Sequence, residues 1–388
     1  RPANSLRSNT RGRPARRPET LPPRPALFGV LVGVKDVIHV EGLPTRAGTR
    51  LVELAGEEGP VVKALKESGA VIAGKTVCTE LAYFAPGPTR NPRNLEHTPG
   101  GSSSGSAAAV AAGLVPLALG TQTIGSVLRP AAFCGVVGVK PSYDRLSRAG
   151  VIPLAPSYDH VGWFAVDVAM AKRAASCLVP GWREVPPVSL GGLRAAVPVG
   201  AYLERAEPAG RAGFEAAVET LRRVGMEIEE VEAFEDLDEI EARHGDLLAA
   251  EAWQAHRRLY ERHGSLLRRR TVELLEAGRE VPAARVAEAR AARQVLRRRL
   301  DEALDAGGFD LWLAPAAPGP APRGLCATGD PVMNRPWTQA GLPAVAVPCG
   351  AAPNGLPLGL QLVGRFGRDE ELLAAAAAVE AALGEVLS

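Results

Sequence analysis

The chain has 388 residues, of which 45 are basic and 43 acidic, and its formal net charge of +2 gives no sign of a nucleic-acid or membrane-surface protein. With 46% hydrophobic and 23% charged residues, the composition is that of a globular protein with a large core, and it excludes a disordered or fibrous chain. The five cysteines are scattered without a CxxC or finger-type spacing, which gives no metal-binding pattern and favours a reducing, cytoplasmic setting.

The first 27 residues are rich in arginine and proline and contain no apolar segment, so we expect a loose arm and no signal peptide. The uncharged stretch from Thr98 to Leu128 is interrupted by many Gly, Ser, Thr and Pro residues, which indicates buried core and not a membrane span. We therefore divide the chain into an arm, 1–27, and one domain, 28–388, and we expect neither a membrane nor a nucleic-acid partner.

The domain opens with an apolar run of β-forming residues from Phe28 to Val40, which predicts a central strand that is buried on both faces. Lys35 lies in the middle of this run. The features expected next are a helix over 59–70, a strand over 70–74, a Gly/Ser loop over 99–106, a helix over 106–113, a strand over 114–119, a turn over 120–126 and an apolar segment over 133–139. This alternation of helices and buried strands predicts an α/β fold.

Between 203 and 306 the chain becomes strongly charged and helical, as in Pro208 to Gly225, where Phe214, Val218 and Leu221 fall on one helical face. Two arginine clusters occur here, at 268–270 and 297–299, but acidic residues are interleaved with them, so we expect solvated faces with ion pairs. Strand patterns return at 309–314, 343–347 and 358–363, and an Ala-rich helix is expected after Asp369.

The Gly/Ser run from Gly100 to Ser106 is a weak signal alone, because such runs are most often linkers. Here a helix and a buried strand follow at once, so the backbone of the run must lie inside the fold, where unpaired N–H groups are costly. Ser126 lies 24 residues after Ser102, on a second glycine-containing turn. Two serines on turns beside the buried Lys35 form a candidate nucleophilic site.

Three segments, Gly33–Asp36, Gly100–Pro130 and Cys134–Pro141, closely resemble the amidase signature family, and the likeness extends from about residue 28 to the end of the chain. Within that family, 328–337 and 355–364 look most like the malonamidase branch. The resemblance implies one large α/β domain with a central mixed sheet covered by helices. We expect 203–306 to be a helical excursion from this domain that lines the substrate pocket.

The resemblance also implies a Ser-cisSer-Lys triad, in which Ser126 is the nucleophile, Ser102 the bridging residue and Lys35 the base, with a cis peptide bond before Ser102. A free lysine has a pKa of about 10.4, so a base that works near pH 7 needs this pKa to fall by about three, which corresponds to roughly 4 kcal/mol. The apolar run around Lys35 can supply this through burial.

The oxyanion hole is expected in the backbone N–H groups of Thr123, Ile124, Gly125 and Ser126. Most family members have glycine in place of Ile124, and a β-branched residue is strongly disfavoured at positive φ. If the position needs a negative φ, Ile124 keeps the N–H group and only narrows the pocket; otherwise the hole is distorted.

Arg129 lies three residues after Ser126 and matches an arginine that holds the substrate carboxylate in the malonamidase branch. A planar guanidinium suits this task, because it pairs with a carboxylate through two hydrogen bonds. A structural arginine that binds carbonyl groups at the turn is the equal alternative. Thr121 is the second residue expected to contact the substrate.

Other catalytic patterns have less support. Gly101–Gly105 satisfies GxSxG, but no strand precedes it, as a nucleophile elbow at Ser103 would require. The six histidines show no metal-ligand spacing, so we expect no metal and no cofactor. Cys134 lies in an apolar segment and is expected to be a packed thiol.

We therefore expect an amidohydrolase that cleaves a small amide, one that carries a carboxylate being a candidate, through an acyl-enzyme on Ser126, and releases ammonia. One alternative is the amidase subunit of a tRNA-dependent amidotransferase, which would act with a partner; Gln122, where such subunits usually have aspartate, and the displaced arginine disfavour it. Another alternative is a non-catalytic family member, because Ile124 replaces the glycine of most relatives and because the arm, 1–27, replaces the N-terminal helices that relatives usually have. The expected binding partner is a small-molecule amide substrate. A homodimer is a further expectation that we keep open.

Overall fold

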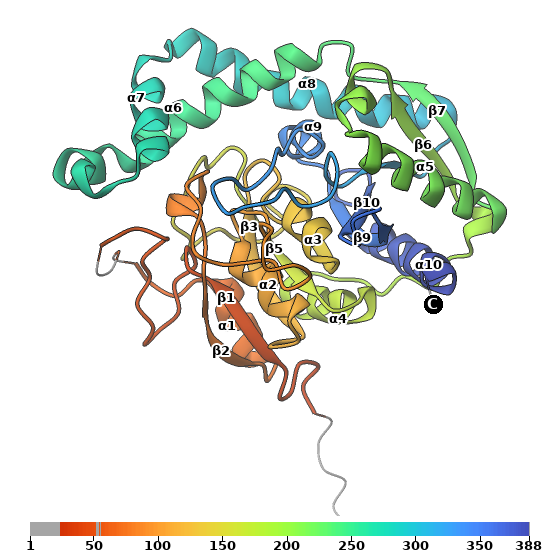
Figure 1. Cartoon of the computed structure of the whole chain (residues 1–388), viewed down its shortest axis with the longest axis horizontal. Helices are drawn as coiled ribbons and strands as arrows, with labels where there is room; N and C mark the ends of the chain where they lie inside the picture. The colour runs from red at the N-terminus through yellow and green to blue at the C-terminus, as the bar shows by residue number, and fades with distance from the viewer. Residues whose placement is uncertain (1–23, 52–53, 55, 388) are drawn as a thin grey trace, which may run out of the picture.

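The computed structural model describes residues 24–51, 54 and 56–387, so most of the expected arm, 1–27, lies outside the described residues (Figure 1). The strands are β1 (Leu31–Lys35), β2 (Val71–Thr76), β3 (Leu117–Gln122), β4 (Val137–Lys140), β5 (His160–Ala165), β6 (Arg194–Val199), β7 (Glu227–Glu232), β8 (Leu311–Pro315), β9 (Ala344–Ala351) and β10 (Pro357–Val363). The α-helices are α1 (Pro60–Glu67), α2 (Ser104–Ala111), α3 (Leu128–Cys134), α4 (Val168–Leu178), α5 (Pro208–Arg223), α6 (Leu237–His263), α7 (Arg269–Glu280), α8 (Ala283–Gly307), α9 (Arg335–Ala340) and α10 (Asp369–Leu387). Short 3₁₀ helices are η1 (Glu80–Ala82), η2 (Leu190–Gly192), η3 (Gly200–Arg205) and η4 (Gly264–Leu266).

All of these strands belong to one sheet, in the order β2-β1-β3-β5-β4-β9-β10-β8-β6-β7. At one end, β1 runs parallel to β2 and β3, and at the other, β6 runs parallel to β7 and β8. In the middle of the sheet, from β3 through β5, β4, β9 and β10 to β8, each strand is antiparallel to the next. The sheet is therefore mixed, and the predicted α/β domain with a central mixed sheet is confirmed.

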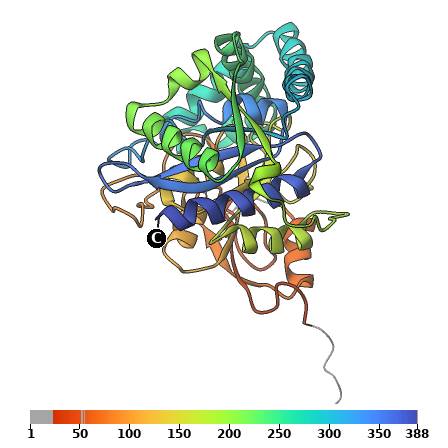
Figure 2. The ribbon, with the colours of Figure 1, turned by 90° about the vertical axis from the view of Figure 1, so that its right-hand side faces the viewer.

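Strand side chains alternate between two hydrophobic cores, one on each face of the sheet. In β9, Val345 and Val347 belong to a core with side chains of α1, α4, α5 and α10. Ala344 and Ala346 belong to a second core with side chains of α2, α3, α8 and α9. Figure 2 shows α4 and α10 together on one side of the sheet, and Figure 1 shows α6, α7 and α8 as an outer layer.

The two strands nearest the expected site are shorter or shifted compared with the predictions. The strand predicted over 28–40 covers only Leu31–Lys35, because the backbone turns after Lys35, with the N–H of Ile38 donating to the Lys35 carbonyl. The strand predicted over 114–119 begins after Pro116, which has no N–H for the ladder, and continues to Gln122. Lys35 and Gln122 therefore end neighbouring parallel strands at the same edge of the sheet.

The segment 203–306 is largely helical, as predicted, but it also contains β7 at the edge of the sheet. The helix predicted over Pro208–Gly225 is α5, and the helix expected after Asp369 is α10. Ion pairs occur at both arginine clusters, as expected, with Arg269 paired to Glu273 and Arg299 to Asp236. Within the described part of the chain, no helix has the length and apolar character that crossing a membrane requires.

Candidate active site

Lys35, Ser102 and Ser126 meet at the carboxyl ends of β1 and β3. Lys35 is the last residue of β1 and is 0% exposed. Its Nζ lies 2.8 Å from Ser102 Oγ, in the loop before α2. The peptide bond between Gly101 and Ser102 is cis, as the resemblance implies. Ser102 and Ser126 both line one small pocket, so the structure brings the three residues of the expected triad together.

The environment of Lys35 favours a neutral amine. Burial lowers its pKa from 10.5 to about 7, and the nearby carboxyl group of Asp159 only partly opposes this. The carbonyl oxygen and the hydroxyl oxygen of Thr121 lie 3.3 Å and 2.7 Å from Nζ. A neutral amine has two N–H groups, which these oxygens can accept, and one lone pair, which remains for the hydroxyl proton of Ser102.

Thr121 therefore contacts the base and is not among the residues that line the pocket in the described structure. The expectation of a substrate contact for Thr121 gains no support from this position. Its hydroxyl instead orients the amine of Lys35 toward Ser102.

The Gly/Ser run is a packed loop whose hydroxyl groups bond to neighbouring backbone. Ser104 Oγ donates to the carbonyl of Gly100 at 2.8 Å, and Ser106 Oγ donates to the carbonyl of Leu119 at 2.8 Å. Ser103, the serine of the GxSxG pattern, has its Oγ 3.1 Å from the carbonyl oxygen of Thr121. These bonds explain how a polar loop is buried between α2 and β3 at little cost.

The turn over 123–126 joins β3 to α3 and carries Ser126. Gln122 shapes it, because its Oε1 accepts the N–H groups of Val127 and Leu128 at 2.8 Å and 3.0 Å. At Gly125 a Cβ atom would lie 2.3 Å from Oδ1 of Asn334, so any larger residue would displace the Asn334 side chain from its hydrogen bonds to Ala316 and Gln361. Among the described residues, none accepts a hydrogen bond from the N–H groups of Ile124, Gly125 or Ser126, which leaves these groups available.

Ile124 occupies this turn without a positive φ. Its carbonyl accepts a hydrogen bond from Thr338 Oγ1 at 2.6 Å, and its side chain lines the pocket. The backbone conformation is therefore one that a β-branched residue can adopt. Of the two expectations for Ile124, the geometry agrees with a retained N–H group and a narrowed pocket.

Arg129 is on α3, is 2% exposed and lines the pocket. Its Nη2 donates to the carbonyl of Gly101 at 2.7 Å and to Thr328 Oγ1 at 3.2 Å. Its Nε and Nη1 have no hydrogen-bond partner among the described residues. Burial lowers its pKa to about 9. Nη2 thus fixes the loop before Ser102, whereas Nε and Nη1 have no partner in the part of the chain that the structure describes.

The other walls of the pocket come from Tyr83 and Phe84 after η1, from Leu154 and from Pro331. Its empty space, which includes open solvent at the mouth, is only about 260 Å³, so the pocket is narrow. The segment 203–306 was expected to line the pocket, but it contributes none of the residues that line it in the described structure. It instead contacts η1, which precedes the pocket residues Tyr83 and Phe84: the N–H of Arg268 donates to Glu80 Oε1 at 2.7 Å.

Asp159 is a residue near the site that the sequence analysis missed. Its Oδ1 accepts the hydroxyl proton of Thr123 at 2.6 Å, next to the expected oxyanion donors. Between Ala149 and Val166 it is the one acidic residue, and no lysine or arginine occurs there. An isolated charge in an apolar stretch is the same signal that drew attention to Lys35.

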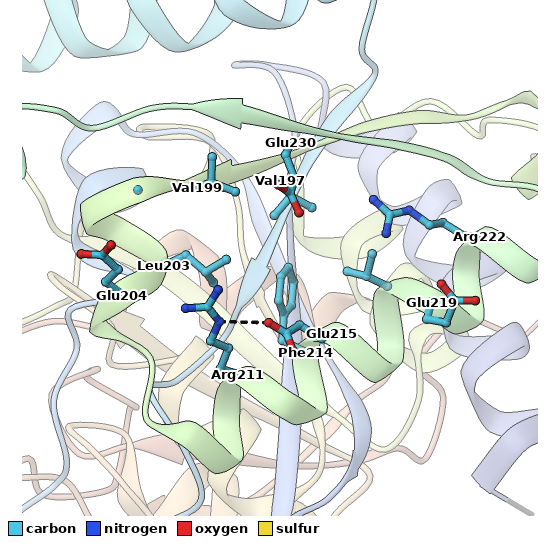
Figure 3. Close-up of a pocket in the computed structure, with 12 residues that line it drawn as sticks. Val197, Val199, Leu203, Glu204, Arg211, Phe214, Glu215, Glu219, Arg222 and Glu230 are labelled. Atoms are coloured by element: carbon cyan, nitrogen blue, oxygen red, sulfur yellow. Dashed lines mark hydrogen bonds and ion pairs between the residues drawn. The ribbon is translucent and has the colours of Figure 1, made fainter.

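A larger groove with about 970 Å³ of empty space lies between α5, β6 and β7 (Figure 3). Its floor contains Val197, Phe214 and Val218, and its rim carries the ion pair between Arg211 and Glu215 at 2.9 Å. No Ser, Cys, His or Lys lines it in the described structure, and its charged lining consists of Glu and Arg side chains, so it offers no serine or cysteine nucleophile beside a lysine or histidine base. The small pocket beside Lys35 is the better candidate for chemistry.

Comparisons with known proteins agree with this geometry. A sequence model of the family described as Amidase matches residues 9–373. A curated relative, a glutamyl-tRNA(Gln) amidotransferase subunit from Koribacter versatilis (strain Ellin345), is 34% identical, over 93% of this chain and 86% of its own length. The crystal structure of an amidase is similar with a TM-score of 0.85 and 34% identity, covering 92% of this chain and 85% of that one. The corresponding glutamyl-tRNA(Gln) amidotransferase subunit from Thermotoga maritima has a TM-score of 0.76 and 31% identity, covering 91% and 83%. The chain therefore belongs to the amidase signature family, and it is an amidase that acts on amide C–N bonds.

Proposed function

We propose that this chain hydrolyses a small amide through an acyl-enzyme on Ser126 and releases ammonia. The observation that carries the proposal is the buried amine of Lys35, which lies 2.8 Å from Ser102 Oγ. Ser102 and Ser126 line the same pocket. A neutral lysine there can remove a proton from a serine hydroxyl near pH 7.

In the first step, Ser126 Oγ attacks the amide carbonyl carbon while its proton passes to Ser102, whose own proton passes to Lys35. The N–H groups of the turn over 123–126 stabilise the oxyanion. The intermediate then expels the amine, which takes the proton back through Ser102, and leaves an ester on Ser126. Water attacks this ester by the same route, which releases the acid and restores the serine.

The residues that line the pocket also indicate which amides could bind there. The unpaired Nη1 of Arg129 can donate to a carboxylate, and the side chains of Ile124 and Phe84 leave little room for a large group. A short amide that carries a carboxylate therefore fits best. Leu154 and Pro331 complete the pocket with apolar surface, which suits the aliphatic part of such a molecule.

This chemistry fits a free-standing amidase and also the amidase subunit of an amidotransferase, and the relatives give more support to the second. The curated relative from Koribacter versatilis and the solved structure from Thermotoga maritima are both glutamyl-tRNA(Gln) amidotransferase subunits, which favours this branch over the malonamidase branch. In that setting the amide is glutamine and a partner receives the ammonia. Gln122 supports the free-standing setting, because its Nε2 donates to Thr338 Oγ1 at 2.9 Å, a bond that an aspartate could not donate.

The two settings are separated by measuring ammonia release from glutamine, dicarboxylic monoamides and neutral amides. The purified chain is compared with Ser126→Ala and with the chain purified together with any co-expressed partner subunits. Hydrolysis of monoamides by the chain alone supports a free-standing amidase. Glutamine hydrolysis that needs a partner supports the amidotransferase setting. Equal ammonia release by wild type and Ser126→Ala would contradict both.

A further inference from the structure

A buried carboxylate joins the oxyanion turn to the segment that carries Leu154, another residue that lines the pocket. Asp159 is 7% exposed and directly precedes β5. Its Oδ1 accepts the Thr123 hydroxyl at 2.6 Å and the N–H of Ala155 at 3.2 Å. Its Oδ2 accepts the N–H groups of Leu154 and Ala155 at 2.9 Å and 3.1 Å. Oδ1 therefore joins the Thr123 turn to the segment of Leu154 and Ala155, and Oδ2 binds that segment alone.

The sheet places Asp159 beside the turn. β3 and β5 are antiparallel, and Gln122 is paired with His160 at the end of the ladder. The next residue of the turn, Thr123, therefore lies opposite Asp159. Ile124, Gly125 and Ser126 follow directly, so the Thr123 hydroxyl is the first anchor of the turn after β3 ends.

A carboxylate is the group that this position requires. Each oxygen faces only donors, namely one hydroxyl and the N–H groups of Leu154 and Ala155. An asparagine would place an NH₂ group against at least one of these donors, which breaks a hydrogen bond and leaves two donors facing each other. Burial raises the pKa of Asp159, and the hydrogen bonds to its oxygens oppose that change.

We propose that Asp159 is a positioning residue, which holds the oxyanion turn in register with the Leu154 wall through the Thr123 hydroxyl. This inference rests on the proposed function. Oxyanion donors act on charge that develops in the transition state, so displacement of the turn lowers kcat and has little effect on KM.

The test uses Asp159→Asn, Thr123→Val and the double variant, with ammonia release measured on the best amide for the wild type. We expect each single variant to lower kcat about 10- to 100-fold, with KM within about threefold. The double variant should be about as slow as the slower single variant, because both changes break the same bond. Thr123→Ser should recover most of the activity that Thr123→Val loses.

Asp369→Asn is the matched control. Asp369 is 4% exposed and accepts the N–H and the hydroxyl of Ser142, both at 2.7 Å, and it is not among the residues that line the pocket. Its loss should reduce stability as Asp159→Asn does, while kcat stays near the wild-type value. An equal fall of kcat in Asp369→Asn and Asp159→Asn would overturn the proposal, as would additive effects of the two site variants.

A second measurement does not depend on turnover. Backbone hydrogen exchange at Val127 and Leu128, whose N–H groups donate to Gln122 Oε1 at the end of the turn, should become faster in Asp159→Asn and Thr123→Val, and should be unchanged in Asp369→Asn. Unchanged exchange in the two site variants would overturn the positioning role. Ammonia release that is equal in wild type and Ser126→Ala would instead refute the proposed function, and the exchange measurement would still decide the role of Asp159.

Discussion

The pKa of Lys35 sets the strongest prediction for activity. Burial lowers this pKa from 10.5 to about 7, which corresponds to about 5 kcal/mol of free energy against the charged amine. Because the neutral amine is the base, kcat/KM should rise with pH through an apparent pKa near 7 and level off above it. His244 should not produce this limb, because burial places its pKa well below 6.5.

The assay is total ammonia released at fixed times between pH 5.5 and 9, and the matched control is Lys140→Met. Lys140 is also fully buried, with a pKa lowered to about 7, but it donates to the carbonyls of Pro141 and Leu342 and is not among the residues that line the pocket. Lys140→Met should keep the limb, and Lys35→Met should abolish activity. A flat profile between pH 6 and 8.5, or a limb lost in Lys140→Met, would refute the assignment of Lys35 as base.

The same pKa affects stability. The unfolded lysine keeps its proton up to about pH 10.4, whereas folded Lys35 loses its proton near pH 7. Folding therefore releases a proton above pH 7, and the contribution of this group makes the free energy of unfolding rise with pH. Between pH 7 and 8.5, Lys35→Met should reduce this slope by up to about 1.4 kcal/mol per pH unit in urea titrations. An unchanged slope would show that the buried amine stays charged.

Three further substitutions test the pocket. Gly125→Ala places a Cβ atom 2.3 Å from Asn334 Oδ1, so kcat should fall at least about tenfold; steady-state kinetics at near wild-type rates would contradict the tight fit. Ile124→Ala should lower KM about tenfold for amides with a bulkier acyl group, and an unchanged substrate range would show that Ile124 does not limit the pocket. Arg129→Leu should raise KM about tenfold or more for a carboxylated amide, and clearly less for a neutral one. Because Arg129 also holds the Gly101 carbonyl, only the difference between the two substrates is informative, and equal increases would remove the carboxylate role.

Much of the fold could be predicted because its signals are local. Apolar runs and the proline and glycine residues beside them mark β1, β2, β3, β8, β9 and β10. The helix α3 was missed because its residues form one apolar run with β4, and Pro130 obscured the helical pattern although proline is tolerated in a first turn. The strand β7 was missed because four of its six residues are glutamates, which an exposed edge strand can carry.

The site could be predicted only in part, for a similar reason. The family resemblance and the apolar surroundings of Lys35 led to the three residues that the structure brings together. The roles of Asp159, Asn334 and Thr338 depend on contacts between segments far apart in the chain, and no local pattern contains them. Thr121 was expected to contact the substrate, but its hydroxyl oxygen lies 2.7 Å from Nζ of Lys35.

The most direct test of the central claim is to trap the covalent intermediate. Wild-type enzyme is mixed with its best amide and acid-quenched during turnover, and the protein is examined by intact and peptide mass spectrometry. We predict an adduct on Ser126 with the mass of the acyl group, namely the substrate minus ammonia, and no adduct in Ser126→Ala. An adduct on Ser103 or Cys134, or turnover that persists in Ser126→Ala, would contradict Ser126 as the nucleophile.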